Sequence, residues 1–287
     1  MAPSLVLSLL FATFSMLAYG IVDFVIAILA RRSESTRLIL WSSIILVIML
    51  LPGLLFFQAP KISAFELGLA LFGAVSAVVA LSAFYEGLRI GKLSVVVPIG
   101  NAWSIITVIA GVFLLNEALN TPQLIGVVLA ILGTVVVSFK LHDVVRLRFN
   151  KIVLGGEYAL VSMLGFGILF AVMGYLAGLL GWYWSALITM SIGAAVRLLF
   201  SLFRKTKLSF PIEVAPTLLL GSILGALALI AYNISSAYGY IAISGPIAAS
   251  SPFITLMLGV ILLKEKPERN QLLGILMIIA GIVLMAY

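Results

Sequence analysis

The chain has 287 residues, of which 63% are hydrophobic and 9% charged, and its mean hydropathy is +1.28. Soluble domains are about 45–50% apolar and about 25% charged, so this composition excludes a cytosolic enzyme. The chain has no cysteine and one histidine, which excludes thiolate sites, disulfides and histidine metal clusters. A net charge of +7 would suit nucleic acid, but the cations flank apolar segments. We therefore expect an integral membrane protein without a metal site, a cofactor or a nucleic-acid partner.

Apolar segments of about the length that spans a bilayer follow one another along the chain. The ten segments are Val6–Ala30, Leu38–Phe57, Phe65–Leu88, Leu93–Leu115, Gln123–Phe139, Ile152–Leu176, Trp182–Phe203, Val214–Tyr238, Ile241–Leu263 and Leu272–Tyr287. Strands of a membrane barrel would alternate polar and apolar residues, whereas the run Ile44–Leu51 is apolar on every side. We therefore expect an all-α protein with ten transmembrane helices, embedded in the lipid bilayer of the cell membrane and monomeric.

The two halves of the chain repeat one another at a shift of 148 residues. Between Gly91–Phe139 and Gly239–Tyr287, 16 of the 49 aligned pairs are identical, without a gap. The identical pairs include Pro98 with Pro246, Glu117 with Glu265, Gln123 with Gln271, Gly126 with Gly274 and Gly133 with Gly281. An apolar composition produces chance Leu or Ile matches, but not coincident Pro, Glu and Gln. We expect a duplicated five-helix unit, with residues 1–139 as the first repeat, 140–151 as a basic linker and 152–287 as the second repeat.

An odd number of crossings decides how the two repeats are related. If both halves share a fold and each crosses the membrane five times, the second half enters from the opposite face. The repeats are then inverted about an approximate twofold axis in the membrane plane. This architecture is common in secondary transporters, in which the substrate site lies between the repeats and access to it alternates between the two faces.

The matched residues resemble the EamA repeat of the drug/metabolite transporter superfamily. Each half has a helix with an early proline, a Leu-rich end that closes in a glutamate, and a following helix of the Gln-x-x-Gly…Gly type. In addition, Tyr19-Gly20 stands where the family usually has Trp-Gly. The resemblance implies a ten-helix carrier, and no enzyme, for small organic metabolites such as amino acids, nucleosides, sugars or cationic drugs. The chain has no phosphate-binding Gly-x-x-x-x-Gly-Lys-[Ser/Thr] motif, so the expected transport is exchange or ion-coupled.

The most concrete expectation is that amino acids, including aromatic ones, move outward by alternating access. The expected cavity lies between the first, third, fourth, sixth, eighth and ninth segments. Its amide, hydroxyl and aromatic groups, with one or two acids, suit a zwitterion better than a polyphosphate, which would need several buried cations. One alternative is a proton-coupled exporter of lipophilic cations that uses Asp23 for both proton and substrate. A more remote alternative is a membrane enzyme or a lipid scramblase.

Asp23 is the sharpest candidate for a functional side chain. It lies inside the first segment, about 12 Å from the Arg31-Arg32 end at 1.5 Å per residue. A carboxylate at that depth is costly unless it is solvated or paired. It could bind a substrate amine or carry a coupling proton, or it could be an acid in a wet vestibule that pairs with an arginine.

Polar and aromatic residues in four other segments complete the expected substrate site. Asn101 and Ser104 are three residues apart and share a helix face in the fourth segment. The expected substrate-binding residues are Tyr19, Asp23, Tyr85, Asn101, Trp103, Ser104, Asn233, Ser250 and Ser251. The alternative for the hydroxyl groups is hydrogen bonding between helices. Glu86 lies three residues before Arg89, which favours an ion pair, and Trp182 to Trp184 resemble an aromatic belt at the membrane interface.

The repeated prolines and glutamates are given structural roles. Pro98 and Pro246 are expected to be hinges, one nearer each face, because a proline inside a helix removes a hydrogen bond. The alternative is that both prolines only mark the start of a helix. Glu117 and Glu265 are expected to tie the turn to the next helix by accepting backbone hydrogen bonds at a helix N-terminus. Equivalent positions at opposite faces cannot both belong to one substrate site.

The distribution of basic residues predicts the orientation. The connections after the odd-numbered segments, counted with their flanking helix ends, hold 16 of the 17 Lys and Arg residues, and Lys61 alone lies on the other side. Cytoplasmic loops retain Lys and Arg, so both termini should lie outside the cytoplasm. Members of the resembled family are generally described with their termini inside, and we follow the charge count.

Overall fold

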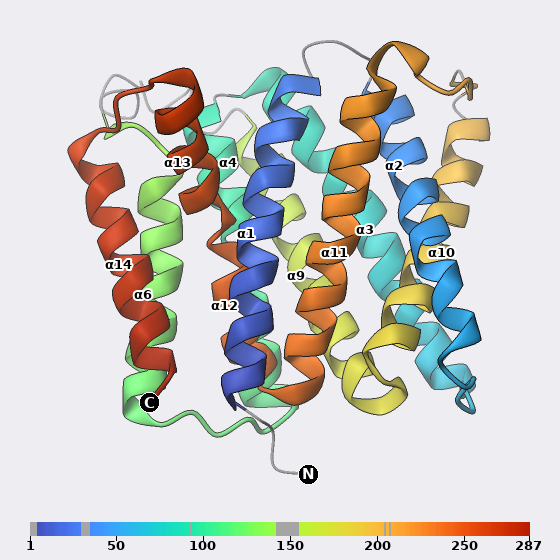
Figure 1. Ribbon diagram of the computed structural model, residues 1–287, viewed down its shortest axis with the longest axis horizontal. Helices are drawn as coiled ribbons and strands as arrows, with labels where there is room; N and C mark the ends of the chain where they lie inside the picture. Colours follow the sequence, from blue (N-terminus) through green and yellow to red (C-terminus); the bar gives the residue numbers. More distant parts are fainter. Residues whose placement is uncertain (1–4, 30–34, 92, 142–154, 204, 207) are drawn as a thin grey trace.

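The computed structural model describes residues 5–29, 35–91, 93–141, 155–203, 205–206 and 208–287, so most of the expected linker lies outside the described residues. Every regular element in these ranges is helical, which confirms the all-α prediction (Figure 1). The elements are α1 (Leu5–Leu29), α2 (Ser35–Leu50), η1 (Leu51–Leu55), α3 (Ala64–Ile90), α4 (Leu93–Asn101), α5 (Ser104–Ile109), η2 (Ala110–Leu114), α6 (Thr121–Val137), α9 (Gly156–Leu180), α10 (Trp182–Phe203), η3 (Ile212–Val214), α11 (Ala215–Tyr238), α12 (Ile241–Ala249), α13 (Ser251–Leu263) and α14 (Arg269–Met285).

Eight helical segments of the described chain are long and apolar enough to cross a membrane. Four of them combine consecutive helical elements, namely Arg37–Leu55, Val95–Leu114, Ile212–Tyr238 and Ile241–Leu263. The remaining apolar helices, α6 and α14, have 17 residues each, which corresponds to about 25 Å. The protein is therefore a multi-pass membrane protein.

Helices α6 and α14 pack against each other along one side of the molecule (Figure 1). A Cβ added to Gly126 would lie 2.6 Å from the carbonyl oxygen of Gly281, and one added to Gly133 would lie 2.7 Å from that of Gly274. Small residues let membrane helices approach this closely. The contacts run in opposite directions along the two helices, so the repeated glycines form an antiparallel pair with an approximate twofold axis perpendicular to it.

The fourth and ninth apolar segments are interrupted helices. The helix is broken after Asn101, between α4 and α5, and after Ala249, between α12 and α13. The two breaks are equivalent under the repeat. Each follows its proline by three residues, and Pro98 and Pro246 lie inside α4 and α12 with five helical residues before them. The prolines therefore do not mark helix starts, as the alternative to the hinge required.

The ends of the helices define two faces. The terminal face holds the start of α1, the end of α14 and the first turn of α12, at the bottom of the view in Figure 1. The opposite face, called the basic face here, holds the start of α2 and the ends of α3, α10 and α13. Of the Lys and Arg residues in the described ranges, only Lys61 lies toward the terminal face. The others lie on this side and are Arg37, Arg89, Lys140, Arg197, Lys205, Lys264, Lys266 and Arg269. Between the faces, α3 packs on α9 and α1 packs on α11.

Candidate functional site

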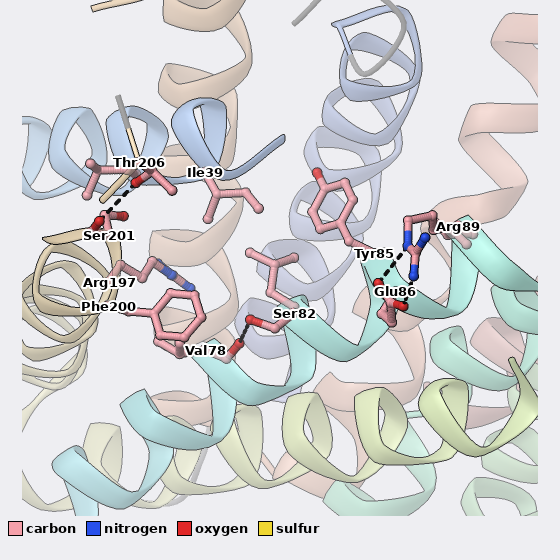
Figure 2. A pocket seen from close by; sticks show the side chains of 13 residues that line it. Ile39, Val78, Ser82, Tyr85, Glu86, Arg89, Arg197, Phe200, Ser201 and Thr206 are labelled. Carbon is pink, nitrogen blue, oxygen red and sulfur yellow. Dashed lines mark hydrogen bonds and ion pairs between the residues drawn. The ribbon is translucent and has the colours of Figure 1, made fainter. Parts of the chain in front are cut away.

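A pocket of about 730 Å³ lies between α2, α3 and α10 at the basic face (Figure 2). Its walls come from the first turns of α2 and the last turns of α3 and α10. Exposed side chains in its lining, among them Ser82 and Phe200, show that it opens to the surface. Tyr85 is the only expected site residue in the lining. The pocket thus lies beside the second and seventh segments, which were not expected to line the cavity.

Arg197 supplies a positive charge inside this pocket. Its Nη1 donates a hydrogen bond to Ser43 Oγ at 2.7 Å, and its buried Nε has no hydrogen-bond partner in the described chain. No carboxylate of a described residue forms an ion pair with it, whereas Arg89 at the pocket's edge pairs with Glu86, as predicted. Sequence reasoning gave Arg197 no role, although it is the one charged residue inside its apolar segment.

Asp23 and Ser251 meet where α1 passes the break between α12 and α13. Ser251 Oγ donates a hydrogen bond to Asp23 Oδ2 at 2.9 Å, and Thr255 Oγ1 donates one to the carbonyl oxygen of Gly20 at 2.9 Å. A Cβ on Gly20 would lie 2.8 Å from the carbonyl oxygen of Ser251, so the glycine of the Tyr19-Gly20 pair allows this approach. The Asp23 side chain is exposed, and no cation of the described chain pairs with it.

Aromatic rings from four parts of the chain gather next to the break after α4. Trp103 stacks on Phe170 of α9 at 4.2 Å between ring centroids, and the Phe170 ring meets the Tyr232 ring of α11 edge-on at 4.9 Å. Tyr19 of α1 meets the same Phe170 ring edge-on at 6.1 Å. Sequence analysis selected Tyr19 and Trp103 but missed Phe170 and Tyr232. For Tyr232 the adjacent Asn233 was an available signal; for Phe170, one Phe among 17, there was none.

The remaining candidate residues are dispersed. Asn101 is half-buried at the end of α4, and Ser104 is buried at the start of α5. Ser250 donates a hydrogen bond to the carbonyl oxygen of Pro246 at 2.8 Å and lies 3.0 Å from the Thr134 hydroxyl. Asn233 is fully buried; its Nδ2 donates to Leu229 and its Oδ1 has no partner in the described chain. The structure therefore joins Asp23 with Ser251 and Tyr19 with Trp103, but does not gather all nine residues around one pocket.

The repeated glutamates differ in their partners. Glu117 accepts hydrogen bonds from the backbone amides of Ile241 at 2.8 Å and Ala242 at 2.9 Å, at the start of α12 in the other repeat. Burial raises the pKa of the Glu117 carboxyl, and these two amides act in the opposite direction. These hydrogen bonds are at the N-terminus of α12 and not at that of the next helix along the chain, α6, which Asn120 and Gln123 cap reciprocally. The Glu265 carboxylate is exposed and has no hydrogen bond or ion pair in the described chain.

Further contacts close the terminal face. The hydroxyl groups of Ser8, Ser235 and Ser244 form a buried cluster, with Ser235 Oγ and Ser244 Oγ 2.6 Å apart. Tyr183 is buried and donates a hydrogen bond from its hydroxyl to the Leu50 carbonyl oxygen at 3.0 Å. The expected aromatic belt is thus partly internal, since Tyr183 packs inward to join α10 to α2. At this face α12 packs against α1, α11 and η2.

Comparisons with known proteins extend these observations. A model of the EamA-like transporter family matches residues 6–139 and again residues 154–287. The uncharacterized protein MJ1333.1 of Methanocaldococcus jannaschii is 31% identical over 138 residues, which are 48% of this chain and 98% of that protein. A crystal structure of a protein matches with a TM-score of 0.74 at 13% identity, over 99% of this chain and 98% of that one. The first relative has about half the length of this chain, and the second likeness concerns the fold alone.

Proposed function

Because the chain belongs to the EamA-like transporter family, we propose that it carries amino acids, including aromatic ones, outward across the cell membrane by alternating access. Transport of small molecules through a membrane is the activity that the family name describes. Amino acids, the outward direction and the mechanism are the proposal. A monomer in a lipid bilayer with ten crossings suffices for it, with α6 and α14 as the two shortest crossings.

The inverted arrangement is supported by the pairing of α6 with α14. These equivalent helices are antiparallel, and the contacts of Gly126 and Gly133 with Gly281 and Gly274 are reciprocal. An axis perpendicular to two membrane-crossing helices lies in the membrane plane. The two repeats, 1–139 and 152–287, then have opposite orientations, an arrangement that is common among alternating-access carriers.

The observation that carries the proposal is a pocket open at one face of a molecule that is closed at the other. The pocket lies at the basic face, while Glu117, the serine cluster and Tyr183 close the terminal face. If the basic face is cytoplasmic, as its Lys and Arg residues indicate, the structure corresponds to the state that loads an exported substrate.

The charges beside this pathway suit a zwitterion. Arg197 offers an unpaired guanidinium group for a carboxylate, and Asp23 offers an exposed carboxylate for an ammonium group. The rings of Tyr19 and Trp103, packed on Phe170, offer an apolar surface for an aromatic side chain. Tyr85 of α3 lines the pocket. Further hydroxyl and amide groups lie on α4, α5 and α11 and at the break between α12 and α13, from Asn101, Ser104, Asn233, Ser250 and Ser251.

Proteoliposomes loaded with radiolabelled phenylalanine test the proposal. We expect carrier-dependent release that unlabelled amino acids outside the vesicles accelerate by exchange. Arg197→Gln should raise the KM for phenylalanine about tenfold, because a charged hydrogen bond is lost, and should leave transport of phenethylamine, which has no carboxylate, unchanged. Arg89→Gln is the matched control, since Arg89 is already paired with Glu86. If no amino acid is released but a labelled lipid moves between the two leaflets, the protein is a scramblase and the proposed carrier function is wrong.

A proton-coupled exporter of lipophilic cations is a second candidate, favoured because no cation among the described residues pairs with Asp23. In that case one carboxylate would bind the proton and the cargo in turn. Efflux of a lipophilic cation that depends on a pH gradient, and that loses all pH dependence in Asp23→Asn, would support this candidate. Amino-acid release without any cation efflux would exclude it.

The orientation has its own test. Alkaline phosphatase fused after Tyr287 should be active and a fluorescent protein at the same place dark, because the terminal face is expected to lie outside the cytoplasm. The reverse pattern would show that the charge rule fails for this chain and that the pocket opens outward.

A further inference from the structure

The two repeats place the same carboxylate in the same local geometry, but only one of the two carboxylates has a partner. Asn116 and Lys264 both have a φ of 55°, a left-handed conformation that ends the preceding helix. The next residue then bonds back in both repeats: Glu117 N–H donates to the Gly111 carbonyl oxygen at 2.9 Å and Glu265 N–H to that of Gly259 at 3.2 Å. The turn that presents each glutamate is therefore built by its own repeat.

At the terminal face this turn meets the start of α12. The first amides of a helix have no partner within the helix, and a carboxylate there is stabilised by the helix dipole. Tyr240, which precedes α12, provides no side-chain hydrogen bond, and Glu117 instead accepts from the amides of Ile241 and Ala242. A contact between the two repeats thus replaces a local helix cap.

The equivalent partners at the basic face are the amides of Leu93 and Ser94, at the start of α4. The Glu265 carboxylate is exposed, and no described group binds it. Helix α12 packs on α5 and η2, but α4 packs on α9, α3 and α6 with no comparable packing on α13. Among the described residues, the basic face therefore lacks the counterpart of the packing that brings α12 to Glu117.

We propose that Glu117 and Glu265 are alternating latches. In the state seen here, Glu117 holds the start of α12 and closes the terminal face. In the opposite state, Glu117 releases α12, and Glu265 accepts hydrogen bonds from the amides of Leu93 and Ser94 and closes the basic face. This exchange rests on the alternating access proposed above, but not on the identity of the substrate.

The glycines beneath the latches support the exchange. A Cβ on Gly111 would lie 2.9 Å from Ala242 Cβ and 3.0 Å from its amide nitrogen, so the closed latch needs a glycine there. A Cβ on the equivalent Gly259 would meet only the Glu265 carboxyl, at 3.4 Å or more, so this structure does not require a glycine at position 259. In the opposite state, the start of α4 would pack over Gly259 and a glycine would be required there.

Accessibility labelling in membranes tests the latches without any substrate. Since the chain has no cysteine, single reporters can be introduced as Ser82→Cys, in the open pocket, and Ser244→Cys, buried at the closed face. Glutamine in place of either glutamate keeps the size but removes the charge. Glu117→Gln should speed labelling at residue 244 relative to residue 82 by about tenfold, and Glu265→Gln should slow it by a similar factor. The double variant should return near the wild-type ratio.

A second pair of variants covers the case in which a glutamine variant does not fold. Gly259→Ala fits the present structure and should slow labelling at residue 244, as Glu265→Gln does, because it blocks closure of α4 over α13. Gly178→Ala is the control, since no atom lies within 4 Å of its added Cβ.

Opposite shifts of the labelling ratio in the Glu117 and Glu265 variants would support the latch. If amino-acid transport is absent at the same time, only the proposed substrate is wrong. Shifts of the same sign, or wild-type ratios in both Glu265→Gln and Gly259→Ala, would overturn the latch while leaving carrier activity to be judged by transport. A residue 244 that is never labelled during active transport would overturn the latch and alternating access at the terminal face together.

Discussion

Two regions of the molecule are built from equally repeated sequence but differ in symmetry. The α6–α14 pair is symmetric in structure, since Gly126 meets Gly281 just as Gly133 meets Gly274. The interrupted helices are not: every residue of α12 is buried, whereas Val97, Ile99 and Asn101 of α4 are half-buried. A region that follows the symmetry of the repeat can keep its structure while the open face closes and the closed face opens. Under the proposed alternating access, a region that departs from the repeat is expected to differ between the two states, and we predict that α4 and α12 are the parts that move.

Breaking the symmetric region should have the largest effect. Gly126→Leu places a large side chain against the Gly281 backbone, and overpacking of this kind costs about 3 kcal/mol, a large part of the stability of a folded chain. We expect little monodisperse protein in detergent and a similar loss for Gly274→Leu, its equivalent. Gly178→Leu on exposed α9 surface should purify normally. A Gly126→Leu protein as stable as the wild type would mean that α6 and α14 are not tightly packed in the membrane.

Neutralising Asp23 should have the next largest effect. Asp23→Asn removes the charge beside the moving α12–α13 break, and loss of a charged contact should lower transport by about tenfold or more. Ser251→Ala should cost less, because it removes only the hydrogen bond to Asp23. Transport rates are compared in variants of equal thermal stability, with Glu86→Gln as a carboxylate control. Normal transport and pH dependence in Asp23→Asn would leave Asp23 without a functional role.

Replacing the prolines should sharpen the contrast between the moving helices. Pro98→Ala and Pro246→Ala restore a backbone donor and straighten α4 or α12, which we expect to slow turnover severalfold with little change in KM. Because Pro98 lies nearer the basic face and Pro246 nearer the terminal face, the two variants should bias accessibility toward opposite faces. Wild-type turnover in both variants would exclude the hinge.

The smallest effect should come from the helix caps of the symmetric pair. Asn120 and Glu268 are equivalent under the repeat, and each forms a reciprocal capping box with Gln123 or Gln271. Asn120→Ala should cost about 1 kcal/mol and lower the melting temperature by a few degrees, with no effect on the ratio of face accessibilities. A large shift of that ratio would place α6 among the moving parts.

Much of the fold was predictable because it depends on local sequence. Apolar runs longer than a bilayer is thick give helices whose bounds agree with the expected segments to within a few residues, as for Trp182–Phe203. The repeated Gln-x-x-Gly…Gly pattern predicted equivalent helices, and the structure adds that they are partners. The spacing of Glu86 and Arg89 was enough for their ion pair.

Less of the candidate site could be predicted from the sequence. Asp23 and Trp103 were selected by their polarity or size inside apolar segments, but Phe170 is one apolar residue among many and becomes notable only through its contact with Trp103. Arg197 was given no role by sequence reasoning. Its importance follows from α2 and α3, which leave a pocket beside it.

The sequence by itself determined helices, their apolar surfaces and two equivalent units, because helix formation, capping and membrane insertion depend on residues near one another in the chain. Each repeat contains a glutamate and the start of a helix with which the other repeat's glutamate can pair: Glu117 pairs with α12, and Glu265 could pair with α4. The local sequence therefore favours closure of neither face. Only the tertiary structure decided which of the two contacts is made, because the start of α4 and that of α12 must each pack against the other repeat, and closing one face leaves the other open.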